Sequence, residues 1–318
     1  MSIRKIAQLA GVSTTTVSRV LNNHPYVTDD KREKVLSVMA EIDYVPNKNA
    51  INLSNGQSGV IGVVVPYTRN SCYDQLIESI LEEATKNHKK VMLLPTYFDK
   101  KLEKEYYTLL RDKTVDGIIV SSKTHDDQFL KELNQFGSII TTEKTKVEDI
   151  ISVYPDRVKI YHIIFKYITT LVSFDSLFIT VTRPKEQSFS TEIKMNLFQE
   201  YFPFKKVEKS FISGISTYND AYLLGKQLFK SNKSPIIYSN GDEVAAGFYQ
   251  AATELGLKNR KDYYLIGEDN QLFSQMLSID TVDFQLKTVG KTAVKKLLSS
   301  SNENSIIDAE FIKRGINH

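Results

Sequence analysis

The stretch IRKIAQLAGVSTTTVSRVLN, residues 3–22, has the pattern of two short helices joined by a tight turn. Its first half carries apolar side chains at the i, i+3, i+4 and i+7 spacing of one helix face. Gly11 follows, and glycine is the residue best suited to the left-handed backbone of such a turn. Ser13 stands where the N-cap of the second helix belongs, and Val17 and Val20 begin the next apolar face.

A third helix is predicted to begin at Thr28. Asp29 and Asp30 place acids in its first turn, where the helix dipole favours negative charge, and Pro46 ends it. Helix, turn, helix, loop and helix in this order is the layout of a helix-turn-helix unit. Residues 1–46 are therefore expected to form an all-α DNA-binding domain.

The polar face of the second helix distinguishes a DNA-binding unit from the alternative, a solvated three-helix bundle with no DNA role. A solvated face is usually built from Glu and Lys, which are better helix formers than Ser and Thr. This face carries short donors and acceptors with one long cation, which can approach base edges and phosphates closely. Its residues are Thr14, Thr15, Thr16, Ser18, Arg19 and Asn22. The pattern favours DNA.

The same region resembles the LacI–GalR family of lactose and galactose repressors. The similarity is nearly continuous over residues 3–57 and is carried by IAQLAGVSTTTVSRVLN at 6–22, VT at 27–28, KREKV at 31–35 and YVPN at 44–47. The resemblance implies a homodimer that binds a pseudo-palindromic operator in double-stranded DNA.

Within this resemblance, the second helix supplies the groups that read the operator. Thr14, Thr15 and Arg19 correspond to the residues that contact bases in the major groove. Five more are implied to lie close to phosphates or the groove edge, namely Ser13, Ser18, Asn22, Tyr26 and Thr28. Threonine reaches a thymine methyl or a single acceptor, so Arg19 is expected to make the strongest base contact, to a guanine.

Residues 47–58 are polar and contain glycine, and by composition they predict a flexible linker. The family resemblance implies a further role, because its members form a short helix here on DNA and wedge a leucine into the minor groove. Asn47, Ala50 and Leu53 are the residues implied to contact DNA in this hinge. Unstacking a base step costs roughly a few kcal/mol, which the added protein contact offsets.

From Val60 onward, strand-length apolar runs alternate with amphipathic helices, which is typical of a doubly wound parallel sheet. A first series predicts strands at 60–65, 91–95, 117–120 and 138–142, and a second series after Pro155 predicts them at 176–181, 207–212, 235–238 and 263–266. Two series indicate an α/β core of two lobes over residues 59–318, with a cleft at the carboxyl ends of the strands.

The family resemblance continues here, more loosely, through IGVVVP at 61–66, VDGII at 115–119 and GED at 267–269. It implies a periplasmic-binding-protein-like domain that dimerises and holds a small effector in the cleft. The implied effector residues are Tyr67, Asn70, Tyr73, Ser188, Glu192, Asp242 and Asp269. Aromatic faces and carboxylates suit a carbohydrate. For Tyr67 and Tyr73, ordinary packing beside the cleft is the alternative.

The sequence departs from the family where an arginine usually grips the effector, because Glu192 stands at that position. An anion there disfavours phosphorylated or carboxylated effectors and favours a neutral sugar or a cationic ligand. The leading hypothesis is a repressor of a carbohydrate-utilisation operon whose operator affinity a sugar controls. The alternatives are a global regulator of the same family controlled by a protein co-regulator, and a regulator with a degenerate pocket.

Composition and missing motifs narrow the other classes of function. The chain of 318 residues has a formal net charge of +3 and one cysteine, Cys72, which excludes an intramolecular disulfide. It has no membrane-length apolar run and no signal-peptide pattern at its N-terminus, so a cytoplasmic protein without membrane contact is expected. The five histidines are scattered, and no phosphate-binding glycine loop or nucleophile elbow occurs. We therefore expect no metal, no cofactor and no enzymatic activity. A solute-binding protein without a DNA role is a further alternative, and the DNA-binding pattern of residues 1–58 disfavours it.

Overall fold

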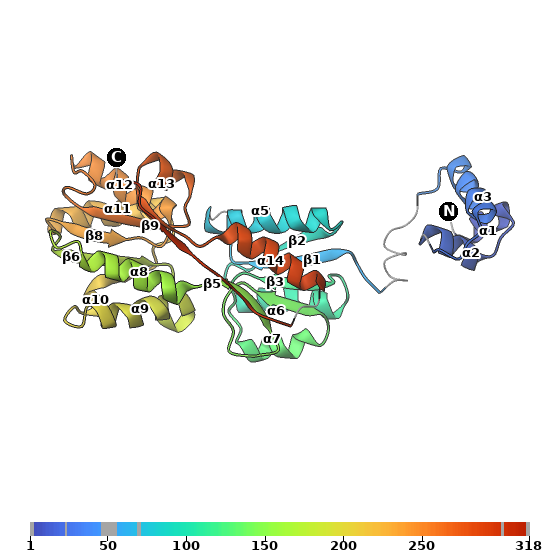
Figure 1. Ribbon diagram of the computed structural model, residues 1–318, viewed down its shortest axis with the longest axis horizontal. Helices are drawn as coiled ribbons and strands as arrows, with labels where there is room; N and C mark the ends of the chain where they lie inside the picture. The colour runs from blue at the N-terminus through green and yellow to red at the C-terminus, as the bar shows by residue number, and fades with distance from the viewer. Residues whose placement is uncertain (1–2, 23, 46–55, 69–70, 300–301, 316–318) are drawn as a thin grey trace.

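The computed structural model describes residues 3–22, 24–45, 56–68, 71–299 and 302–315. A domain of three helices, α1 (Ile3–Ala10), α2 (Thr14–Leu21) and α3 (Asp29–Glu41), precedes a larger domain of two lobes, each built on a six-stranded sheet (Figure 1). None of the described helices combines the length and the apolarity that crossing a membrane requires.

The three N-terminal helices enclose a small apolar core, formed by Ile6, Ala7, Ala10, Val17, Val20 and Val35. Gly11 has a φ of 63°, the left-handed conformation expected for the turn between α1 and α2. Ser13 caps α2, because its hydroxyl oxygen accepts from the Thr16 amide at 3.1 Å. The predicted order of helix, turn, helix, loop and helix is confirmed.

The first lobe has a parallel sheet in the order β11-β5-β4-β3-β1-β2. Its strands are β1 (Val60–Val65), β2 (Lys90–Pro95), β3 (Gly117–Val120), β4 (Ser138–Thr141), β5 (Ile151–Pro155) and β11 (Ser305–Ile307). Helices α5 (Ser71–Lys86) and α14 (Leu286–Ser299) pack on one face, and α6 (Lys100–Arg111) and α7 (Asp127–Asn134) on the other. Val63 belongs to the first of these buried clusters and Val64 to the second, which explains why β1 is apolar throughout.

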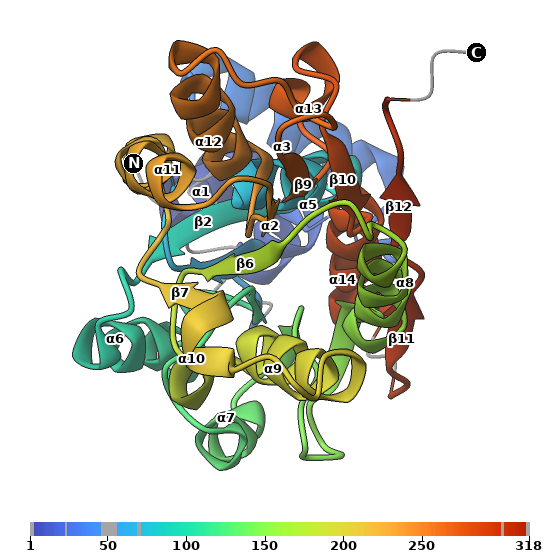
Figure 2. The same cartoon turned by 90° about the vertical axis from the view of Figure 1, so that its left-hand side faces the viewer.

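The second lobe has a sheet in the order β12-β10-β9-β8-β6-β7. Its strands are β6 (Ser176–Val181), β7 (Phe211–Ser213), β8 (Pro235–Tyr238), β9 (Tyr264–Glu268), β10 (Asp280–Asp283) and the antiparallel β12 (Glu310–Ile312). Helices α8 (Arg157–Thr169) and α9 (Phe189–Tyr201) pack on one face. The other face is covered by α11 (Tyr218–Ser231) and α12 (Asp242–Glu254), which Figure 2 shows side by side. Three short helices complete the lobe: η1 (Lys185–Gln187), α10 (Val207–Ser210) and α13 (Leu272–Met276).

The chain crosses between the lobes three times. It passes from β5 to α8 at Asp156, from β10 to α14 at residues 284–285, and from β11 to β12 at residues 308–309. Figure 1 shows the consequence: α14 lies beside α5 in the first lobe although β10 and β12 belong to the second. The lobes are therefore joined by three separate segments of the chain.

The two lobes are therefore not two successive halves of the chain, which corrects the predicted pair of series. The predicted strands omit β5, β10, β11 and β12, and β11 returns to the first lobe after the second is almost complete. The segment 207–212, predicted as one strand, forms the helical turn α10 and then the short β7. Apolar periodicity does not reveal which sheet a segment joins, and short runs are ambiguous between helix and strand.

Gly290 allows α14 to pack closely against α5. A Cβ atom at this position would overlap the Ser79 hydroxyl oxygen and lie 2.9 Å from the Leu76 carbonyl oxygen. We expect Gly290→Ala to force the helices apart and to lower the free energy of unfolding by about 1–3 kcal/mol. Lys295→Ala, at an exposed position of the same helix, should change it by less than about 0.5 kcal/mol. Urea unfolding followed by circular dichroism measures both, and equal midpoints for the two variants would contradict the close packing.

Candidate functional site

Helix α2 presents the side chains that the sequence assigns to major-groove contacts. Thr14, Thr15 and Arg19 are exposed, whereas Val17 and Val20 are buried against the other two helices. The helix carries no acidic residue. Its outer face therefore offers hydroxyl groups and a guanidinium to a phosphate backbone without a repelling charge.

The remaining predicted DNA residues of this domain surround α2. Ser13 and Asn22 stabilise its two ends, since the Asn22 amide donates to the Ser18 carbonyl at 2.9 Å. Tyr26 is 83% exposed, and Thr28 occupies the N-cap position of α3 without a side-chain cap bond. Asn47, Ala50 and Leu53 lie outside the described residues, as does Asn70 of the first lobe.

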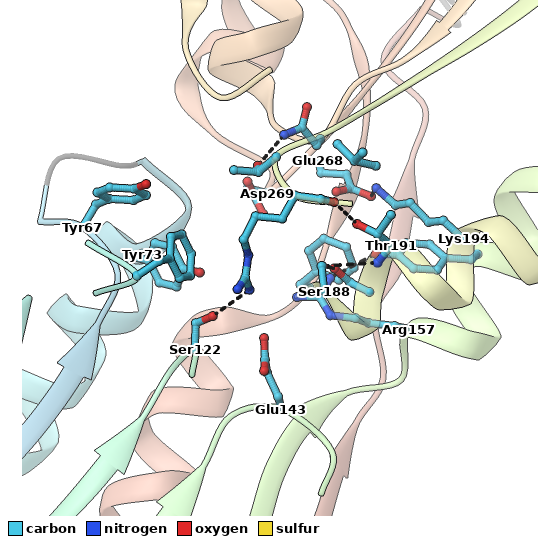
Figure 3. Close-up of a pocket in the computed structure, with 18 residues that line it drawn as sticks. Tyr67, Tyr73, Ser122, Glu143, Arg157, Ser188, Thr191, Lys194, Glu268 and Asp269 are labelled. Carbon is cyan, nitrogen blue, oxygen red and sulfur yellow. Dashed lines mark hydrogen bonds and ion pairs between the residues drawn. The ribbon is translucent and has the colours of Figure 1, made fainter. Parts of the chain in front are cut away.

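A cavity of about 120 Å³ lies between the two lobes and is termed the inner cavity. Its polar lining comes from loops and helix starts that follow the carboxyl ends of the strands, as expected for parallel sheets. Figure 3 shows Tyr67, Tyr73, Ser122 and Glu143 of the first lobe facing Arg157, Ser188, Thr191, Lys194, Glu268 and Asp269 of the second.

Arg183 reaches from the loop after β6 to the first lobe. Its guanidinium carbon lies 3.9 Å from the centre of the Phe98 ring, and it donates to the Ser122 hydroxyl at 3.2 Å. A second contact joins the lobes where the Gln75 side-chain amide of α5 donates to the Asp269 carbonyl at 2.9 Å. Direct contacts therefore connect both lobes beside the inner cavity.

A buried ion pair forms part of the second lobe's wall of the inner cavity. Lys194 Nζ lies 2.8 Å from Glu268 Oε1, with side chains only 4% and 6% exposed. The Tyr238 hydroxyl donates to the same carboxylate oxygen at 2.5 Å. Burial by itself lowers the pKa of Lys194, but the adjacent Glu268 carboxylate more than offsets this and holds that pKa above its usual value. The ammonium group therefore stays charged.

Four predicted effector residues line the inner cavity, namely Tyr67, Tyr73, Ser188 and Asp269. Tyr67 also packs edge-on against Phe98, with ring centres 5.5 Å apart. Its ring therefore both lines the inner cavity and packs against a neighbouring side chain. Glu192 does not line the inner cavity. It faces a second space of about 850 Å³, termed the outer chamber, whose lining includes Lys123, His125, Lys185 and Phe189.

Asp242 supports the cavity wall from behind instead of lining the cavity, contrary to the expectation from the sequence. It is fully buried at the start of α12, and its carboxylate accepts from the Gln271 amide and the Thr281 hydroxyl, each at 2.6 Å. Burial raises the pKa of Asp242 to about 6, against the lowering effect of these hydrogen bonds. Its oxygens are used to hold the loop that carries Asp269.

The sequence argument missed the cations of the inner cavity. Arg157, Arg183 and Lys194 line it, although Glu192 at the family's arginine position predicted an anionic site. Arg183 lies two residues after the end of β6, and Glu143 lies two residues after the end of β4. The carboxyl ends of the strands converge on the cleft. A search of the positions just after each predicted strand would therefore have found both Arg183 and Glu143.

Two pairs of non-glycine residues with a left-handed backbone lie beside the inner cavity. Tyr97 and Phe98 have φ values of 52° and 58°, and Asp269 and Asn270 have values of 90° and 47°. A non-glycine residue in such a conformation costs about 1–3 kcal/mol and persists only where its surroundings hold it. The Tyr97 amide donates to the Pro66 carbonyl at 2.9 Å, and the Asn270 side chain donates to Asp283 at 2.9 Å. Both loops are thus fixed at the cleft.

Across the residues that the structure describes, no cluster of His, Cys, Asp and Glu is arranged to hold a metal ion. The arrangement instead defines a class of protein, a two-lobed ligand-binding domain attached to a helix-turn-helix unit.

Comparison with known proteins identifies the family. Residues 2–47 match the family model of bacterial regulatory proteins, lacI family, and residues 58–314 match that of periplasmic binding proteins and sugar binding domain of LacI family. The chain therefore belongs to the LacI family of bacterial regulatory proteins. It is a DNA-binding transcriptional repressor with a sugar-binding domain, and not an enzyme.

Similar proteins include other regulators of transcription. The chain is 33% identical over 314 residues to catabolite control protein B of Bacillus subtilis (strain 168), with 98% of this chain and 99% of that protein covered. It is 26% identical over 300 residues to the ribose operon repressor of Halalkalibacterium halodurans, with 93% and 89% covered. The crystal structure of the lac repressor dimer bound to operator and the anti-inducer ONPF matches with a TM-score of 0.82 at 21% identity, covering 99% of this chain and 98% of that one. This last likeness shows a shared fold.

Asp242→Asn tests the supporting role of this buried carboxyl through its pH dependence. A pKa of about 6 in the folded chain, above the usual 3.8, means that the folded state binds more protons than the unfolded state between these values. The free energy of unfolding of the wild type should therefore fall, relative to the variant, by about 3 kcal/mol as the pH rises from about 4 to 7. Urea unfolding across this range measures the difference, and a difference that does not vary with pH would contradict the effect of burial.

Proposed function

We propose that this repressor controls a carbohydrate-utilisation operon and that a sugar in the inner cavity sets its affinity for the operator. The observation that carries the proposal is the convergence of polar side chains from both lobes on one small space. Arg183 and Lys194 supply donors, and Glu143 and Asp269 supply acceptors, which matches hydroxyl groups that both donate and accept. Similarity to a ribose operon repressor supports the same class of ligand.

The balance of charge in the inner cavity supports a neutral sugar. Three cations, Arg157, Arg183 and Lys194, face three carboxylates, Glu143, Glu268 and Asp269, so their formal charges cancel. A neutral polyhydroxylated ligand bonds to groups of both signs, whereas a ligand with net charge meets groups of like sign as well.

The proposed mode of DNA binding is that of a homodimer on a pseudo-palindromic operator. Thr14, Thr15 and Arg19 of each protomer enter the major groove, and the exposed face of α2, free of acids, supports this. The further contacts by Ser13, Ser18, Asn22, Tyr26 and Thr28, and by Asn47, Ala50 and Leu53 of the hinge, rest on the family resemblance. Exposed apolar side chains on β2 and α13, among them Leu93, Leu272 and Met276, support a contact with a second copy.

Rotation of the lobes is the proposed link between the ligand and the operator. The three crossings permit the first lobe to turn against the second, and a ligand that bridges both lobes stabilises one orientation. Its effect on operator affinity cannot exceed its difference in affinity for the two orientations. In the dimer, this rotation would separate the two hinge segments and withdraw Leu53 from the minor groove.

Arg19→Ala is expected to weaken operator binding by about 1–3 kcal/mol and to relax the preference at one base pair of each half-site, because a direct base contact is removed. Arg4→Ala, at an exposed arginine of α1, removes the same charge and should leave the base preference unaltered. Fluorescence anisotropy with operator variants at fixed salt measures both. An unchanged base preference in Arg19→Ala would exclude the proposed contact.

The proposed function itself is tested by selection from random duplex DNA with the full chain, repeated in the presence of a panel of neutral sugars. We expect a palindromic sequence to be enriched and one sugar to change its affinity. Enrichment that no sugar alters would refute control by a sugar and favour a protein co-regulator or a degenerate pocket. Absence of enrichment would refute operator recognition.

A further inference from the structure

The inner cavity and the outer chamber adjoin each other. Phe98 and Glu143 of the first lobe and Arg183 and Ser188 of the second line both spaces. These four residues are termed the neck. Each lobe contributes two of them, so the neck exists only where the lobes face each other.

The inner cavity is too small to hold a typical ligand by itself. Small-molecule sites usually enclose about 300–1,000 Å³. The inner cavity measures about 120 Å³, whereas the outer chamber measures about 850 Å³. A ligand of that size therefore extends beyond the inner cavity, and the neck leads to the larger of two neighbouring spaces, of about 850 and 280 Å³.

The neck has hydrogen-bonding groups that the described part of the protein does not use. Arg183 donates to Ser122 and has no carboxylate within ion-pair distance among the described residues, so most of its N–H groups lack an acceptor there. The Glu143 carboxylate points into the cavity and makes no hydrogen bond or ion pair with a described residue (Figure 3). A ligand hydroxyl in the neck can accept from Arg183 and donate to Glu143.

Aromatic rings line the path from the neck into the outer chamber. The strained backbone at Phe98 holds its ring at the neck, where the ring already stacks with the Arg183 guanidinium. Phe189, the first residue of α9, lines the outer chamber but not the inner cavity and is 38% exposed. His125 of the outer chamber is fixed by stacking on Phe129, with ring centres 4.2 Å apart. Such amphipathic surfaces suit the apolar faces of sugar rings.

We propose that the effector is a saccharide of at least two linked sugar units, with one unit in the inner cavity, one in the outer chamber and the linkage at the neck. This assignment rests on the proposed function, since it requires that the effector is a sugar. Lys194 and Asp269 bind the inner unit, Arg183 and Glu143 bind hydroxyls beside the linkage, and Phe189 packs against the outer unit.

Calorimetric titration of the full chain with sugars of different length tests the assignment. The probes are glucose, galactose, fructose and ribose, then sucrose, lactose, maltose and cellobiose, then raffinose and maltotriose. We expect at least one di- or trisaccharide to bind at least about tenfold more tightly than any of its constituent monosaccharides. A monosaccharide that binds as tightly would overturn the two-unit assignment and leave control by a sugar intact. Failure of every saccharide to bind would overturn control by a sugar as well.

Phe189→Ala tests for a sugar unit outside the inner cavity. It should weaken binding of the longer saccharide about tenfold and leave binding of its monosaccharide unchanged, because Phe189 lines the outer chamber and does not line the inner cavity. Phe204→Ala, at a 99% exposed phenylalanine of the same lobe, is the matched control and should alter neither. Thermal unfolding of both variants verifies the fold. Equal affinities of Phe189→Ala and Phe204→Ala for the longer saccharide would refute a unit in the outer chamber.

Discussion

The structure depends on one covalent constraint, the three crossings that join the lobes at Asp156, at residues 284–285 and at residues 308–309. They hold the carboxyl ends of the parallel strands of two sheets face to face, and at such ends side chains from several strands converge. The inner cavity follows from this arrangement, since neither lobe encloses it alone. In the proposed function the lobes rotate about the same crossings, so one feature underlies both the inner cavity and the proposed response to a ligand.

The charged groups of the cleft divide into two kinds with different physical roles. Lys194 and Glu268 are buried and paired at 2.8 Å, and removing one of such a pair leaves an uncompensated buried charge. They stabilise the second lobe's wall of the inner cavity whether or not a ligand is present. Arg183 and Glu143 lie at the neck, partly exposed and without an ion-pair partner among the described residues. These two groups are available to a ligand, whereas the groups of the buried pair already bind each other.

In the cleft, two residues at positions that the family uses for its effector do not line the inner cavity. The family position of a ligand-gripping arginine holds Glu192, and from sequence alone this indicated an anionic site. In the structure Glu192 faces the outer chamber, and Arg183, nine positions earlier, lines the inner cavity. Asp242 kept its family position but is buried among backbone and hydroxyl donors of its own lobe. Position in a motif predicted that these residues lie near the cleft, but the direction of each side chain depended on packing.

The sequence by itself determined the helix-turn-helix unit, the alternation of strands and helices, and the family, because these signals are local. The exposed polar groups of α2 lie within three turns of one helix, so their spacing along the chain is also their arrangement in space. Only the tertiary structure decided the membership of β11 and α14 in the first lobe, the burial of Asp242 and the composition of the neck. Arg183 and Ser122 are 61 residues apart and belong to different lobes. The periodicity of apolar residues does not predict such a contact, because the contact forms only when the strand ends of two separate sheets face each other.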